Sequence, residues 1–177
     1  MTSRDDRALR APDGLAGDVL AEVGVRTWVK TSGSKGFHVV APLDGEAGFE
    51  DVAALADAVG RRLVERDPRL TLEFIKADRG GRIFVDIGRN QYSATFACAY
   101  AVRARAGAPV SVPCSWEEVA EGRVGPTSFN VRSMLERVAD VGDLWSGLYE
   151  EAQSATRALA QLGGPPEGPS PARRRFR

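Results

Sequence analysis

The stretch VRTWVKTSGSKGFHVVAPL, residues 25–43, decides the fold of this chain. Residues 25–30 are predicted to form a strand, because apolar, aromatic and β-branched side chains dominate them. The following TSGSKG, residues 31–36, is too rich in glycine and serine to continue that strand. Residues 37–43, FHVVAPL, again have the composition of a strand. We therefore expect a hairpin of two strands joined by a six-residue loop.

Helical periodicity is visible on both sides of this hairpin. Residues 15–23 predict a short helix that Gly24 ends, since a residue without a Cβ suits a helix C-terminal cap. Residues 49–65 predict the clearest helix, with apolar residues at positions 52, 55, 56, 59 and 63. Its polar residues are expected to face water: Glu50, Asp51, Asp57, Arg61 and Arg62. Helical spacing recurs over 116–120, 131–138 and 144–162, whereas 70–77 and 90–112 fit helix and strand equally.

A further strand is predicted over IFVDI, residues 83–87, after the turn DRGGR. In an extended, buried strand Asp86 would point to the face opposite residues 83, 85 and 87. A carboxylate there is costly unless it is paired, hydrogen-bonded or bound to a metal. The sequence leaves two readings of Asp86 open: a metal ligand, or a salt bridge with Arg82, Arg89 or Arg103.

Length and composition restrict the class of protein. A chain of 177 residues suits one domain and excludes a small disulfide scaffold. Its 24 basic and 24 acidic side chains argue against a protein that binds nucleic acid through overall positive charge. Cys98, Cys114 and the single His38 do not make a zinc site without carboxylates, so buried free thiols are expected. We expect a domain over 15–162 between a disordered N-terminus, 1–14, and a disordered basic tail, 163–177.

No long apolar run and no apolar signal-peptide core are present in the sequence, which predicts a cytoplasmic protein without a membrane segment. The charges are unevenly distributed along it. Residues 44–73 and 117–151 sum to −4 and −5, whereas 25–43 and 76–105 sum to +3 and +4. Positive strand regions beside acidic helices are what a sheet needs to hold phosphates; scattered solvated arginines are the alternative.

The hairpin loop has the residue types that bind anions: Ser32, Gly33, Ser34, Lys35 and Gly36. Glycines let backbone N–H groups turn toward an anion, hydroxyls donate hydrogen bonds and lysine supplies charge. The order of residues is not that of a Walker loop, because a strand rather than a helix follows. A purely structural hairpin loop is the alternative.

Two more groups lie where they could assist such a loop. A lone histidine is usually a core or surface residue, but the position of His38 directly after the loop favours contact with a ligand. Arg103 and Arg105 would share a face on a strand and could hold a polyanion together, whereas on a helix they would diverge.

Five segments, in this order, resemble the polymerase domain of bacterial DNA ligase D, a member of the archaeo-eukaryotic primase superfamily that serves non-homologous end joining. They are KTSGSKGFHVVAPL (30–43), RGGRIFVD with its following asparagine (79–90), YAVRARAGAPVSVP (100–113), SWEEV (115–119) and DLWSGLYEEA (143–152). The resemblance implies an α+β fold, with a mixed or antiparallel sheet that bears the loop and Asp86 and is backed by helices.

The resemblance also implies roles for individual residues. The motif from Ser32 to His38 would contact the triphosphate and sugar of an incoming nucleotide. Asp86 would be the catalytic carboxylate and a ligand of Mg²⁺ or Mn²⁺. The implied nucleotide-binding residues are Ser32, Gly33, Ser34, Lys35, His38, Asn90 and Arg103.

One departure from the family pattern concerns the metal site. The family has an Asp-x-Asp motif on a strand well before the loop, and this motif supplies the other metal carboxylates. Lys30 lies too near the start of this sequence for that motif, and Asp5 and Asp6 are adjacent rather than separated by one residue. The resemblance therefore implies a domain that is incomplete at its N-terminus, with impaired two-metal chemistry.

The expected function is that of a ligase D polymerase-domain homologue, which adds nucleotides to DNA ends with a divalent metal but is impaired here. Its expected partners are an NTP or dNTP, DNA ends, and a DNA ligase or Ku-like end-binding protein. One alternative is a non-catalytic module that binds nucleotides or DNA ends. Another is a decayed reading frame without a selected function.

Overall fold

The computed structural model describes residues 14–168 and residue 170. Residues 1–13 of the predicted disordered N-terminus, and residues 169 and 171–177 of the predicted basic tail, lie outside these residues. The chain divides into two compact units, each of which is described by itself. Unit 1 contains residues 14–17, Arg26–Pro42 and Phe96–Glu151, and unit 2 contains Asp18–Val25, Leu43–Thr95 and the described residues from Ala152 onward.

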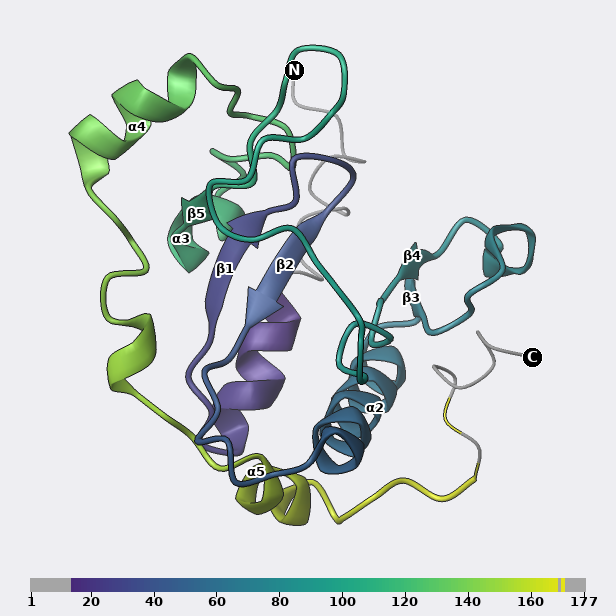
Figure 1. Cartoon of the computed structure of the whole chain (residues 1–177). Coiled ribbons are helices and arrows are strands. Elements are labelled where there is room, and N and C mark those ends of the chain that lie inside the picture. Colours follow the sequence, from purple (N-terminus) through teal and green to yellow (C-terminus); the bar gives the residue numbers. More distant parts are fainter. Residues whose placement is uncertain (1–13, 169, 171–177) are drawn as a thin grey trace. The chain divides into compact units, whose positions relative to one another are not determined.

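The predicted hairpin is confirmed in unit 1. β1 (Trp28–Thr31) and β2 (Phe37–Val40) pair antiparallel (Figure 1). In this register Lys30 lies opposite His38. β5 (Pro113–Cys114) pairs antiparallel with the other edge of β1, which gives a three-stranded sheet in the order β2-β1-β5. All four residues of β1 are buried, as expected of a central strand.

Helices complete unit 1. The predicted helix over 116–120 is confirmed as α3 (Trp116–Ala120), which begins with a capping box formed by Ser115 and Glu118. The helix predicted over 131–138 is α4 (Ser133–Val141). α3 contributes Val119 to the core cluster on the sheet, whose buried members are Val29, Cys114, Val119 and Val124.

The segment that the sequence left open, residues 90–112, is irregular. Single bridges join Val102 to Val110 and Pro109 to Asn130. Around the first bridge the Arg103 amide donates to the Pro109 carbonyl over 2.8 Å, so the segment folds back on itself without forming a regular strand. Both cysteines are free thiols, as predicted, but only Cys114 is buried; Cys98 is exposed on this irregular segment, so its predicted burial was wrong.

In unit 2 the clearest predicted helix is confirmed as α2 (Phe49–Arg66). Its buried stripe includes Leu55, Val59 and Leu63. The prediction that Asp57 faces water was wrong: this residue is 3 % exposed and accepts a hydrogen bond from Arg61 Nε. The buried face is wider than the apolar stripe because α5 packs against α2, and an i,i+4 partner compensates the carboxylate.

The single helix predicted over 144–162 was also wrong. A 3₁₀ turn (Leu148–Glu150) is followed by a break and then by α5 (Ala155–Gln161). The backbone of Gln153 pairs with Leu43 and accepts a hydrogen bond from the Asp44 amide, so it is not available to a helix. Ser154 then caps the new helix by accepting from the Arg157 amide. At the other end of the chain, helical residues 14–22 and Gly24, at φ +70°, confirm the predicted first helix.

The strand predicted over 83–87 is much shorter than expected. β4 (Ile83–Phe84) pairs in parallel with β3 (Leu70–Thr71), and a 3₁₀ turn (Lys76–Arg79) lies between them. With one two-residue neighbour the strand stays half-buried, and Asp86 is exposed beyond its end. The expectation that one sheet bears both the loop and Asp86 was therefore wrong, because β4 belongs to the separate two-stranded sheet of unit 2.

Candidate functional site

The loop between β1 and β2 is closed by the side chain of its first residue. Ser32 Oγ accepts hydrogen bonds from the amides of Ser34 and Gly36, at 3.1 and 3.2 Å, and the Ser32 amide donates to the Gly36 carbonyl over 2.9 Å. Three of the loop amides, those of Ser32, Ser34 and Gly36, are thus already used inside the loop. An anion would therefore meet mainly the side chains that the loop presents, above all the exposed Lys35.

Gly33 brings a distant arginine to this loop. Its φ is +60°, and a Cβ built on it would lie 2.6 Å from Arg103 Cγ and 3.3 Å from the Val110 carbonyl carbon. The aliphatic stem of Arg103 therefore lies against the Gly33 backbone. The structure thus brings together, within unit 1, the predicted loop residues and Arg103, which lies far beyond them in the sequence.

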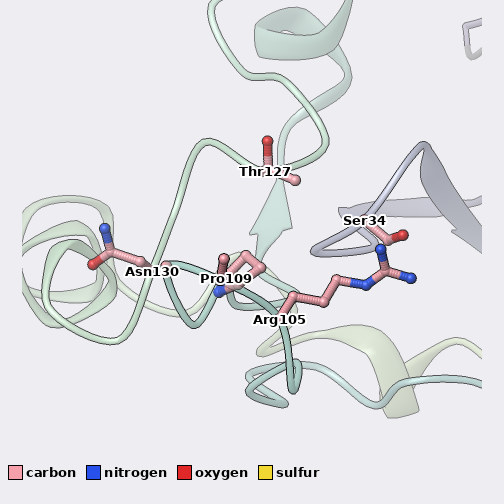
Figure 2. A pocket seen from close by; sticks show the side chains of 7 residues that line it. Ser34, Arg105, Pro109, Thr127 and Asn130 are labelled. Carbon is pink, nitrogen blue, oxygen red and sulfur yellow. The ribbon is translucent and has the colours of Figure 1, made fainter.

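A shallow pocket of about 660 Å³ opens beside the loop within unit 1. Figure 2 shows Arg105 extending its guanidinium toward Ser34. Arg103 and Arg105 do not lie on a regular strand, as one of the two readings of the sequence required, yet both are next to residues of the loop. The pocket is lined by Ser34, Arg105, Ala106, Gly107, Pro109, Thr127 and Asn130.

The structure adds a residue that sequence reasoning missed. Lys30 is fully buried in β1, and its Nζ lies 2.7 Å from His38 Nδ1 and 2.5 Å from Ser111 Oγ. Burial lowers the pKa of Lys30 to about 8. The signal was present in the hairpin register, because Lys30 and His38 face each other once the loop is closed over residues 32–36.

The two predicted residues of unit 2 lie in one turn after β4. Asp86 accepts a hydrogen bond from the Gly88 amide over 3.1 Å and forms an ion pair with Arg89 at 3.3 Å. The salt-bridge reading of Asp86 is therefore present, with Arg89 as the partner. Asn90 is exposed and donates from Nδ2 to the Ile87 carbonyl, which stabilises the same turn.

These side chains do not fit a two-metal centre. Among residues 14–168 and 170, no group of three or more His, Cys, Asp or Glu side chains is placed to hold a metal ion. Asp86 is a single carboxylate with an arginine beside it, whereas Mg²⁺ sites in phosphoryl-transfer enzymes use several oxygen ligands. Asp5 and Asp6 lie outside the described residues.

The sequence also predicts a protein without a membrane segment. Within the described part of the chain, no helix combines the length and the apolar character that crossing a bilayer requires.

Comparison with known proteins gives a consistent family assignment. A family model described as the primase-polymerase domain of LigD matches residues 9–145. Among curated proteins, the multifunctional non-homologous end joining protein LigD of Pseudomonas aeruginosa is 37 % identical over 149 residues. The multifunctional non-homologous end joining DNA repair protein LigD of Mycobacterium tuberculosis strain H37Rv is 36 % identical over 141 residues.

A solved structure is similar as well. The polymerase domain from Mycobacterium tuberculosis ligase D in complex with DNA matches with a TM-score of 0.74 at 32 % identity, over 82 % of this chain. That match agrees with the predicted α+β fold and its antiparallel sheet. The chain covers 50 % of that solved domain, and 18 % of each of the two curated relatives, which match 82 % and 79 % of this chain.

Proposed function

Because this chain belongs to the LigD primase-polymerase domain family, we propose that it binds the triphosphate of an NTP or dNTP at the β1–β2 loop, in the service of nucleotide addition at DNA ends. The observation that carries this proposal is the contact between Gly33 and the stem of Arg103. That contact supports the proposal because the stem of Arg103 lies against the same loop that exposes Lys35.

The chemistry of these groups suits a polyphosphate. Arg103 presents a planar fork of N–H donors that can hold two phosphate oxygens, and Lys35 adds a point charge. Ser34 adds a hydroxyl donor, and His38 follows the loop on β2, where a sugar or phosphate oxygen is its proposed partner. Arg105, beside Ser34, extends the positive surface of the same site.

The catalytic part of the proposal concerns Asp86 and Mg²⁺ or Mn²⁺. Mg²⁺ or Mn²⁺, if Asp86 and further carboxylates held it, would supply Lewis-acid stabilisation of phosphate charge. Asp86 is proposed as the catalytic carboxylate and metal ligand, which requires its ion pair with Arg89 to open and further carboxylates to join it. With the described residues alone, we expect nucleotide addition to be strongly impaired and nucleotide binding to remain.

The proposed macromolecular partners are DNA ends and a DNA ligase or Ku-like end-binding protein, in the cytoplasm. DNA binding is supported by the complex with DNA of the structural neighbour. A non-catalytic nucleotide or DNA-end binding module is the second candidate function. The pairing of Asp86 with Arg89 favours this candidate, because an ion-paired carboxylate is less available as a metal ligand.

The binding proposal is tested by titrating the whole chain with a fluorescent ATP analogue, in Mg²⁺ and again in EDTA. Lys35→Ala is expected to weaken binding about tenfold, the loss that one charge-assisted contact typically brings. Lys76→Ala is the matched control, since Lys76 is an exposed lysine of unit 2 and should not change the affinity. Equal affinities of wild type and Lys35→Ala would contradict the proposed site.

Primer extension distinguishes the two candidate functions. A DNA end with a short 5′ overhang is incubated with the wild-type chain, Mn²⁺ and nucleotides. Addition that Asp86→Ala abolishes supports the polymerase. Nucleotide binding without any addition supports the non-catalytic module.

A further inference from the structure

Lys30 occupies an unusual position for a lysine. Its side chain is fully buried at the centre of the unit 1 sheet, whereas lysines are almost never buried without partners. Burial in this way costs free energy, since the ammonium group leaves water. The loop, by contrast, already has an exposed lysine for contact with phosphate. Lys30 itself therefore does not serve as a surface charge.

With Lys30 protonated, the hydrogen bonds around it fix each donor and acceptor. Ser111 Oγ donates its only proton to the Thr31 carbonyl over 2.6 Å, so toward Lys30 the same oxygen accepts. A protonated lysine has three donors and no acceptor. His38 Nδ1, 2.7 Å from Lys30 Nζ, must then be the acceptor of the second hydrogen bond. In a neutral imidazole whose Nδ1 accepts, the proton resides on Nε2.

Phe96 limits the freedom of both groups. Its ring lies 5.5 Å from Lys30 Nζ, within the range of a cation–π contact. The ammonium group therefore has an aromatic neighbour in addition to its two hydrogen-bond partners. The same ring packs edge-to-face against His38, with centroids 5.8 Å apart and an angle of 85° between the planes. The imidazole is thus held by a ring contact as well as by the hydrogen bond to Lys30.

We propose that Lys30 is a positioning residue, whose buried ammonium group holds His38 as the neutral Nε2–H tautomer. An imidazolium would aim its Nδ1–H at the ammonium group, with no acceptor between them, so the charged form of the ring is disfavoured. His38 is thereby preset as a hydrogen-bond donor from Nε2 to a phosphate or sugar oxygen. This last step rests on the proposed nucleotide site, whereas the tautomer does not.

The arrangement carries a pH dependence of defined sign. Burial lowers the pKa of Lys30 to about 8, so the ammonium group is largely present at pH 7 and largely lost at pH 9. A neutral amine can accept from Nδ1–H as well as donate, and the constraint on the His38 tautomer is then released. The charged or titratable groups that act on Lys30 besides His38 are Arg103, Cys98 and Cys114.

His38 is the single histidine of the chain, so its two ring nitrogens give the only histidine signals in a long-range ¹H–¹⁵N spectrum of the labelled protein. At pH 7 we expect a protonated Nε2 and an unprotonated Nδ1. In Lys30→Met the two nitrogen shifts should move toward each other, as the tautomers mix, and ATP should bind several-fold more weakly. A wild-type spectrum with the proton on Nδ1 at pH 7 would overturn the inference.

A pH series separates positioning from a merely structural role. Between pH 7 and 9 the ring nitrogens of the wild type should shift in one step, and Lys30→Met should lack that step. Cys98→Ser and Cys114→Ala should retain it, which excludes the thiols as its source. The wild-type series needs no substitution, so it still decides the matter if Lys30→Met does not fold, and a wild type without the step contradicts the inference.

Lys35→Ala separates this inference from the proposed function. This variant should lose ATP affinity while its ring nitrogen signals at pH 7 match those of the wild type. If the wild type binds no ATP, the proposed function fails and the tautomer is still read from the same spectra. If ATP binds, but Lys30→Met leaves both the affinity and the tautomer unchanged, the positioning role fails alone.

Discussion

At the scale of single residues, Gly33 links two parts of the candidate site. The φ of +60° is a conformation that costs a residue with a Cβ about 1 kcal/mol or more, and the space that a Cβ would need is taken by Arg103 Cγ. Glycine is therefore favoured at this position for two reasons, the positive φ and the lack of space for a Cβ. Gly36, in the same loop, has neither, since nothing lies within 4 Å of a Cβ built there.

Gly33→Ala is expected to lower the free energy of unfolding by about 1–3 kcal/mol, the sum of strain and displaced contact. It should also weaken ATP binding, because the guanidinium of Arg103 moves with its stem. Urea unfolding and the ATP titration measure the two effects. Gly36→Ala is the matched control, and an equal loss in both variants would show that the Arg103 contact is not the cause.

At the scale of elements, a buried ion pair joins α3 to α4. Glu118 and Arg137 form two hydrogen bonds of 2.6 Å, and each side chain is 11 % exposed. Burial by itself would raise the pKa of Glu118, but Arg137 and the Ser115 amide outweigh it and hold that pKa below its ordinary value. Removing one partner leaves the other charge buried.

Glu118→Ala is therefore expected to destabilise the fold by about 3 kcal/mol, the typical cost of an uncompensated buried charge. Glu117→Ala, on the same helix but exposed, should change stability little. Because the pKa of Glu118 is lowered on folding, its contribution is complete above the ordinary value of 4.5 and is lost as the pH falls through the folded value. Urea unfolding at pH 7, and in steps downward from pH 4.5, checks both statements; a difference between wild type and Glu118→Ala that does not begin to shrink below pH 4.5 would contradict the second.

The elements differ in how far local sequence could predict them. The hairpin and α2 follow from composition and periodicity, and both are confirmed. The break before α5 depends on Gln153 pairing with a segment far away in the sequence, which no local pattern contains. The length of β4 also depends on a pairing partner that local sequence does not reveal, because β3 pairs with it over two residues.

The residues of the candidate site also differ in how far local sequence could predict them. Lys35 was predictable from its loop, since serines, glycines and a lysine between two strands suit an anion. That Arg103 lies against Gly33 depends on the fold of an irregular segment without periodicity, and only the family resemblance singled it out. Lys30 was missed because its partner follows only from the hairpin register: once the loop is closed over residues 32–36, Lys30 lies opposite His38, and composition alone does not give those bounds.

For the whole molecule, the shifted pKa values of Lys30 and Tyr100 determine how the free energy of unfolding should change at alkaline pH. The pKa of Lys30 is lowered to about 8 from 10.5, so between these values the unfolded chain binds more protons and stability rises with pH. Burial and the hydrogen bond to Asp143 raise the pKa of Tyr100 above its ordinary value of 10, so its contribution falls above that pH.

Between pH 8 and 9.5 the Lys30 contribution should therefore dominate the difference between wild type and Lys30→Met. The free energy of unfolding of the wild type should rise relative to the variant by at most about 1.4 kcal/mol per pH unit. Urea unfolding at half-unit steps of pH measures the slope. Parallel curves for the two proteins would mean that Lys30 has the same proton affinity in the folded and unfolded chain.

The central claim is that the β1–β2 loop and Arg103 together hold the triphosphate of a nucleotide. The most direct measurement is a ¹H–¹⁵N titration of the labelled chain with GTP in EDTA, because the chemical shift of each N–H group is followed separately. We expect saturable shifts of the Ser34 and Lys35 amides and of the Arg103 side chain, with a weakened response in Lys35→Ala. Shifts confined to the residues of unit 2, or no saturable shift at all, would contradict it.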